Sequence, residues 1–216
     1  MKINNLIKFK KNLSVFDKII YILFFIILLI GTVYRFSIIN YPVILNLDSG
    51  GYLFPVIKLI TNGEIGISVR TFFYPLFLTI IIELFSGFLA ISYIQHLLGI
   101  AACILTFYMW NKLYSYFSHL SNNLLKFIYQ IIGLLFILSF YLNFEKIIYE
   151  HIIGPEAIFS FMFILFFTVA YFFLKNLNDN RKIRYVNYLA LFLIFLNTAI
   201  YRSEERRVGK ECRSRW

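Results

Sequence analysis

Two polar stretches interrupt a sequence that is otherwise nearly all apolar, and their charged residues are the ones that could do chemistry. The first, residues 46–77, opens with Asp48 before two glycines and closes with Arg70 before an aromatic–proline step. An ionisable side chain near a bilayer is costly, so a functional role is the first interpretation to consider. The alternative is a solvated loop between two helices.

The second stretch, residues 144–156, ends with Glu156 directly after Pro155. Two carboxylates that share a site repel each other, which either raises one pKa or recruits a cation. We expect Asp48 and Glu156 to form one such site. The structural alternative for Glu156 is a helix cap, because an acid in the first helical turn complements the helix dipole. Three further residues are expected to be solvated loop residues rather than ligands: Glu145, Glu150 and His151.

Composition places these stretches in a membrane protein. The 216 residues are 60% hydrophobic and 20% aromatic, against about 45–50% apolar in soluble domains, and several runs exceed the ~20 residues that span a bilayer. The first run is too long for a cleaved signal peptide and lacks a small-x-small site. We predict an all-α, polytopic bundle with about five spanning helices, at 19–39, 91–110, 124–142, 157–174 and 188–201.

Charge decides how the apolar run 72–89 is placed. The lysine-rich first 18 residues predict a cytoplasmic N-terminus. If 72–89 crossed, the basic loop around Arg181 would lie outside, against the positive-inside rule. If 72–89 is instead a juxtamembrane helix in the first external loop, every basic loop is cytoplasmic and Glu83 avoids the bilayer centre. We predict this second topology, with 52–60 as a surface helix and Arg35 as an anchor that snorkels to the outer interface.

The last 15 residues differ sharply from the rest. Residues 202–216 carry six of the 21 basic residues and three of the 11 acids, and they resemble a translated sequencing adapter, the alternative being a native basic tail. We therefore expect residues 1–201 to be the N-terminal part of a longer protein, inactive alone, with net charge +7 and no nucleic-acid partner. The tail also holds Cys212, which leaves Cys103 without a disulfide partner, and the three histidines show no metal-ligand spacing.

Three short motifs resemble the N-terminal region of GT-C glycosyltransferases, a group that includes protein O-mannosyltransferases, the aminoarabinose transferase of lipid A and Rgt-like bacterial transferases. The motifs are D-S-G-G-Y at 48–52, R-T-F-F-Y-P-L-F-L at 70–78 and G-P-E-A-I-F at 154–159. The resemblance covers about 17–201. Two departures, Ser49 after the first acid and Pro155 where threonine is usual, bear on the donor sugar.

The resemblance implies transfer of a sugar from a polyprenyl-phosphate donor to a glycan, lipid or protein acceptor on the outer face. A hydroxyl acceptor needs a carboxylate as general base, and the leaving phosphate needs a cation. It implies that Asp48 and Glu156 are catalytic and bind a divalent ion (Mg, Mn or Zn), and that Arg70, Lys58 and Tyr52 bind substrate. The expected location is a bacterial inner or plasma membrane, as a multi-pass protein among membrane lipids.

Two other functions fit the same sequence. A transporter or flippase would use the acids to line a pathway, although transporters more often place such acids at mid-membrane. A non-catalytic membrane subunit is the third interpretation. The missing sequence after Tyr201 would discriminate, because a soluble external domain favours the enzyme and an inverted repeat favours the transporter.

Overall fold

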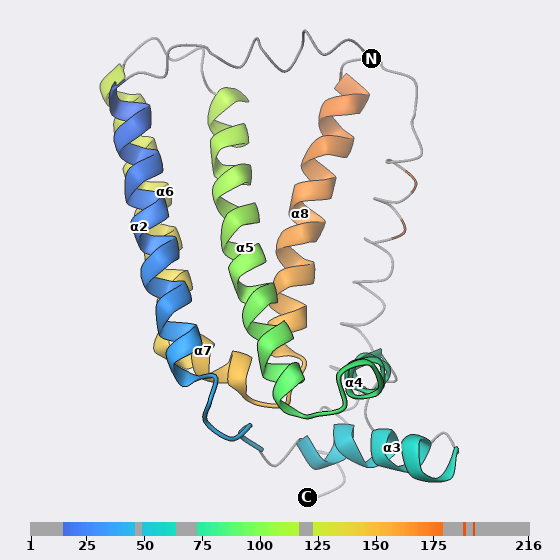
Figure 1. Cartoon of the computed structure of the whole chain (residues 1–216). Helices are drawn as coiled ribbons and strands as arrows, with labels where there is room; N and C mark the ends of the chain where they lie inside the picture. The colour runs from blue at the N-terminus through green and yellow to red at the C-terminus, as the bar shows by residue number, and fades with distance from the viewer. Residues whose placement is uncertain are drawn as a thin grey trace, which may run out of the picture.

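The described part of the chain is all-α. The computed structural model describes residues 15–45, 49–63, 73–116, 123–178, 188 and 192. Four long helices run side by side, and three short ones gather at one end of them (Figure 1). The long helices are α2 (Val15–Ile38), α5 (Leu89–Tyr116), α6 (Asn123–Tyr141) and α8 (Glu156–Asn178). The short helices are α3 (Ser49–Asn62), α4 (Phe73–Phe85) and α7 (Phe144–His151).

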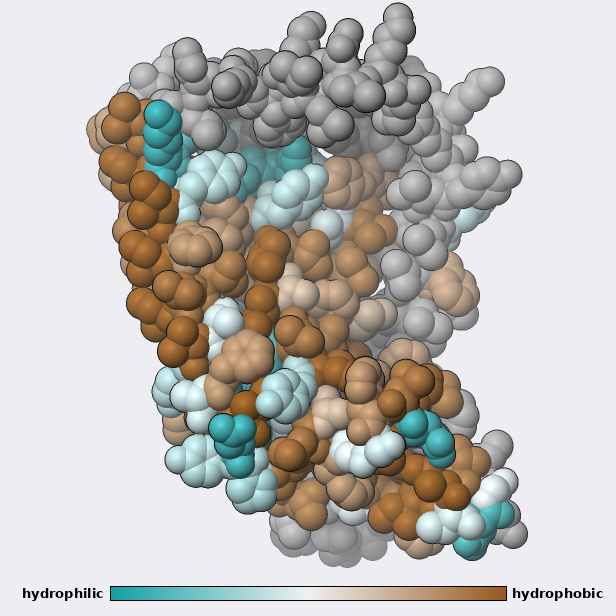
Figure 2. All heavy atoms as spheres, viewed as in Figure 1, coloured by the Kyte–Doolittle hydropathy of each residue, from teal (hydrophilic) through white to brown (hydrophobic). Residues whose placement is uncertain are grey.

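The four long helices are long and apolar enough to cross a membrane. Between 11% and 39% of each apolar window is buried inside the protein, so most of this hydrocarbon faces outward. Figure 2 shows brown apolar surface running along these helices. A water-soluble fold would not leave so much apolar surface exposed, and the structure therefore supports a membrane protein. The predicted spans at 19–39, 91–110, 124–142 and 157–174 each fall on one of these helices, while 188–201 lies almost wholly outside the described residues.

The helix α4 does not cross the bundle. It has 13 residues, about 20 Å of helix at 1.5 Å per residue, which is shorter than the ~30 Å hydrocarbon core. In Figure 1 it lies with α3 and α7 at one end of the long helices, hereafter the short-helix end. The prediction that the run 72–89 forms a juxtamembrane helix beside a second short helix is confirmed.

Two apolar clusters hold the bundle together. The first joins α2, α5 and α6, where the rings of Phe24 and Phe107 stack at 3.8 Å between centroids. The second joins α3, α4, α5 and the start of α8, and Leu78 and Ile91 are fully buried in it. The second cluster fixes α3 and α4 against the end of the bundle.

A short parallel pairing links the two loops at the short-helix end. The amide of Ile44 donates to the carbonyl of His151 at 3.3 Å, and the amide of Ile153 donates to the carbonyl of Ile44 at 3.2 Å. Just beyond it, the Ser49 hydroxyl donates to the Ile153 carbonyl at 2.8 Å. These bonds hold the segment after α2 against the segment between α7 and α8.

Candidate functional site

A pocket of about 250 Å³ opens at the short-helix end between α6, α7 and α8. Its wall is mixed, with apolar surface from Phe140 and Ala157 and polar groups from α7 and α8. The charged residues of the wall are three acids and one base: Glu145, Glu150, Glu156 and Lys146. The wall therefore offers both hydrogen-bond acceptors and a cation to whatever enters the pocket.

Lys146 is the cation of this pocket. Burial lowers its pKa from 10.5 to about 8, and the Arg35 charge lowers it too, while the carboxylate of Glu150 acts in the opposite direction. Its ammonium lies 3.0 Å from the centroid of the Phe140 ring. The first turn of α7 positions it, because Asn143 caps that helix by accepting from the Lys146 amide. An ammonium in a partly apolar wall is poorly hydrated, so it gains from an anionic ligand.

Glu156 lies at the start of α8, as the sequence predicts, and its side chain is exposed at the pocket. Its carboxylate turns back over Gly154, where a Cβ atom would collide with it. Burial raises the pKa of Tyr74, and the negative charge of Glu156 raises it further. The helix-cap interpretation and a functional role are both compatible with this position.

A buried amide fixes the backbone just before Glu156. The side chain of Gln95 on α5 donates to the carbonyl of Gly154 at 2.8 Å and to the hydroxyl of Tyr74 at 3.3 Å. Gln95 is fully buried, so these bonds are shielded from water. The start of α8 is thus tied to α4 and α5, and Glu156 is presented by a rigid support.

Beside the pocket lies a buried ion pair that the sequence analysis missed. The guanidinium of Arg35 binds both carboxylate oxygens of Glu150, from Nε at 2.7 Å and from Nη2 at 2.9 Å. Its Nη1 donates to the carbonyls of Gly31 and Tyr141. The Cζ atom of Arg35 lies 4.0 Å from the centroid of the Tyr141 ring. The side chains are 0% and 1% exposed. The prediction that Arg35 snorkels as an anchor is wrong, because a partner 115 positions later neutralises it within the protein.

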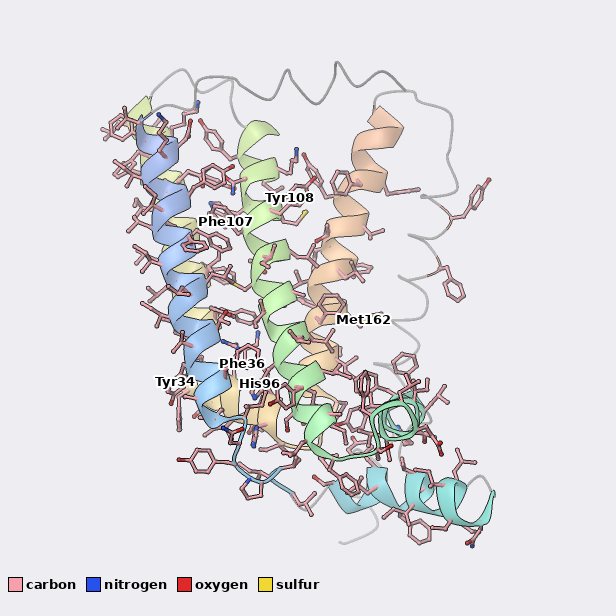
Figure 3. All side chains as sticks on the ribbon, in the orientation of Figure 1. Tyr34, Phe36, His96, Phe107, Tyr108 and Met162 are labelled. Carbon is pink, nitrogen blue, oxygen red and sulfur yellow. The ribbon has the colours of Figure 1, made fainter. Side chains whose placement is uncertain are left out.

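Two histidines extend this ion pair toward the first loop. His96 Nδ1 lies 3.1 Å from Glu150 Oε2, and its Nε2 lies 3.4 Å from Nδ1 of His151. The His151 Nε2 in turn faces the carbonyls of Tyr41 and Pro42 at 3.1 and 3.3 Å. Figure 3 labels His96 on α5 near the short-helix end. The prediction that Glu150 and His151 are solvated is wrong, since both are buried, whereas Glu145 is exposed as expected.

Gly99 makes room for this arrangement. A Cβ atom on Gly99 of α5 would overlap the carboxyl group of Glu150. A helical glycine costs about 1 kcal/mol relative to alanine, and here it allows α7 to bring its carboxylate against α5. The ion pair and the close α5–α7 approach therefore depend on the same residue.

The remaining predicted site residues lie in different surroundings. Asp48 and Arg70 are outside the described residues. Tyr52 is buried in the second apolar cluster, with its ring edge-on to Tyr74 at 5.0 Å. Lys58 is half-buried on α3, and neither it nor Tyr52 lines the pocket. Among the described residues no group of three acid, histidine or cysteine side chains is arranged to hold a metal.

The segments that carry the two predicted catalytic acids nevertheless meet. Ser49, the residue after Asp48 in the sequence, bonds to Ile153, three positions before Glu156. The structure thus brings Glu156 to a pocket with Lys146 and brings the chain next to Asp48 to the same end of the bundle. Comparison with family models, curated proteins and solved structures finds no match for this chain, so the site is interpreted from its own geometry.

Proposed function

We propose that this chain is part of a membrane glycosyltransferase of the GT-C type, which transfers a sugar from a polyprenyl-phosphate donor to an acceptor on the outer face. The observation that carries the proposal is the pocket at the short-helix end, where Glu156 and Lys146 lie together and where Ser49 is bonded to the segment before Glu156. A carboxylate and an ammonium in one pocket suit a reaction that needs a base and releases a phosphate.

The proposed chemistry assigns a role to each charged group. Asp48 acts as general base or metal ligand and Glu156 as the partnering carboxylate, with Mg, Mn or Zn as the candidate cation. Arg70 and Lys58 remain the phosphate contacts that the sequence resemblance implies. Lys146 is a further candidate, because it already lies in the pocket wall. The glycan, lipid or protein acceptor enters from the aqueous side of the same pocket.

The placement of α4 supports the proposed orientation. With α4 at the short-helix end rather than across the bundle, α2 and α5 begin at opposite ends of the bundle. Lys18, Lys112 and Lys126 then all lie at the end away from the short helices. The positive-inside rule makes that end cytoplasmic. The short-helix end with its pocket is then external, in a plasma or bacterial inner membrane.

The test is a comparison of two acids that line the same pocket. Transfer would be measured with a panel of polyprenyl-phosphate sugars, using protein expressed from the intact gene. Glu156→Gln should lower transfer strongly and weaken its response to added divalent metal. Glu145→Gln is the matched control and should leave transfer near normal, because Glu145 is an exposed residue on α7 with no assigned role.

The base assignment is tested at the other acid. Asp48→Asn is nearly isosteric but cannot accept the proton, so it should abolish transfer while the protein still inserts and binds donor lipid. Near-normal transfer by Asp48→Asn would contradict the base assignment. Equal losses for Glu156→Gln and Glu145→Gln would mean that the pocket responds to charge in general and not to Glu156.

A transporter or flippase is the second candidate, and one observation favours it. Buried ionisable chains such as Arg35, Glu150 and His96 also mark proton and ion pathways in membrane proteins. In this protein these three side chains lie at the short-helix end, where Arg35 is in the last turn of α2. They do not lie midway along the bundle. Vesicles containing the purified protein would discriminate, because substrate-coupled proton movement without sugar transfer supports the transporter.

A further inference from the structure

The contacts from Glu150 to the first loop form a line whose two ends can only accept hydrogen bonds. One end is the Glu150 carboxylate, whose two oxygens accept from two N–H groups of Arg35. The other end is the pair of backbone carbonyls of Tyr41 and Pro42. Between these ends lie the four ring nitrogens of His96 and His151.

The three contacts along this line together need three protons. The contact between Glu150 and His96 needs a proton on His96 Nδ1, and the contact between His151 and the carbonyls needs one on His151 Nε2. The contact between the two rings, 3.4 Å from His96 Nε2 to His151 Nδ1, needs a third. Two neutral imidazoles carry two protons in total. Two neutral rings therefore always leave one of the three contacts without a proton.

We infer that the His96–His151 pair is a proton-binding site that takes up one proton, shared across the contact between the rings, and that this proton ties α7, with the first loop bound to it, to α5. A second added proton is excluded by the geometry, because it would place two N–H groups against each other. If Glu150 carried the third proton, each of the three contacts would still have a proton. The Glu150 carboxyl group would then be neutral and would no longer balance the charge of Arg35. This inference does not rest on the proposed sugar transfer.

The surroundings of the pair include both signs of charge. With the added proton, the pair, Arg35 and Glu150 together carry one net positive charge. The titratable and charged groups around the Arg35–Glu150 end of the line come from four helices: Arg35 on α2, Cys103 on α5, Tyr141 on α6, and Lys146 and Glu150 on α7. Because the net charge already includes the Glu150 carboxylate, the added positive charge is not balanced within this group.

The proton acts on the connection between the two loops. His151 accepts from the Ile44 amide through its own carbonyl, and its ring bonds to Tyr41 and Pro42. When the proton leaves, one of the three contacts that join α5, α7 and the first loop is unmade, which weakens their connection by about tenfold. The parallel pairing of Ile44 with the segment before α8 should then open more often.

The proton count can be measured directly on the 216-residue chain in nanodiscs. A His119→Gln background removes the third histidine, so that 15N spectra of labelled histidine report only on His96 and His151. From pH 8 to pH 5, the range in which histidine titrates, the two rings together should gain one proton and end with three protonated nitrogens. Uptake of two protons, or of none, would overturn the inference.

Hydrogen exchange tests the structural consequence. The protection of the Ile44 and Ile153 amides should rise by about tenfold when the pair takes up its proton, after correction for the intrinsic pH dependence of exchange. His151→Phe should abolish this rise. If protection is independent of the protonation state of the pair, the proton does not tie α7 and the first loop to α5 and the inference fails.

Discussion

Removing the buried ion pair one partner at a time, and then both together, tests the best-defined feature of this protein. Arg35→Met leaves the Glu150 carboxylate buried and 1% exposed, with His96 as its remaining side-chain partner among the described residues. Glu150→Met leaves a fully buried guanidinium against two backbone carbonyls and a ring. Each single variant should lose about 3–5 kcal/mol of stability, because an uncompensated charge remains inside the protein.

The double variant Arg35→Met/Glu150→Met should behave differently. Removing both charges also removes the cost of desolvating them, and replacing a buried pair by apolar side chains is often close to neutral. We expect a loss of about 0–2 kcal/mol. The double variant should therefore be more stable than either single one, with a coupling free energy of about 4 kcal/mol or more between the two positions.

The assay is reversible unfolding of the purified chain in mixed micelles, with all four proteins in one lipid and detergent mixture. A matched control is Glu145→Met, which removes an exposed acid from the same helix and should change stability by less than ~0.5 kcal/mol. If the two single losses simply add in the double variant, the side chains do not interact, and the buried pair described above is refuted.

Three further predictions address the pocket, the packing and the topology. Burial holds the pKa of Lys146 at about 8, so between pH 8 and 10.5 the unfolded chain binds more protons than the folded chain, and stability should rise with pH. Lys146→Met should remove this rise and increase the melting temperature at pH 7. An unchanged pH profile of stability in this variant would contradict the prediction. Gly99→Ala should lower the stability by about 1–3 kcal/mol, because its Cβ overpacks against the Glu150 carboxylate. Gly50→Ala, where the new Cβ meets nothing, should change stability little. Equal losses in the two variants would refute the close contact between Gly99 and Glu150. A cysteine at position 62 should react with an impermeant reagent from outside and one at position 178 should not; external labelling at 178 would overturn the orientation.

The sequence predicts the long helices and the placement of α4 because both depend on local properties. The length of an apolar run decides whether it spans, and the sign of the charges between runs decides on which side each loop lies. For the 18-residue run 72–89 the length leaves the question open, and the charges of the flanking loops decide it. The start of α8 at Glu156 is equally local, since proline in the preceding position favours a helix start.

The buried polar line could not be predicted in the same way, because its members are far apart in the sequence. Arg35 near the end of an apolar helix looks like an anchor until a partner is known, and Glu150 comes 115 positions later. One local signal was present. Ile147, Glu150 and His151 recur at three- and four-residue spacing, which places them on one face of a helix, and all three are buried on α7. A polar pair on the same face as a buried isoleucine indicates a buried contact rather than a solvated loop.

The separation between Arg35 and Glu150 also has a consequence for how the chain is made. Ribosomes add about 5–20 residues per second, so Arg35 is synthesised roughly 6–23 s before its partner exists. A guanidinium on α2 that reaches a membrane in that interval lacks this counter-charge, and its long side chain can reach the headgroups from the last helical turn. Arg35 can take its buried position only once α7 has been made, so the final packing of α2 waits for α7.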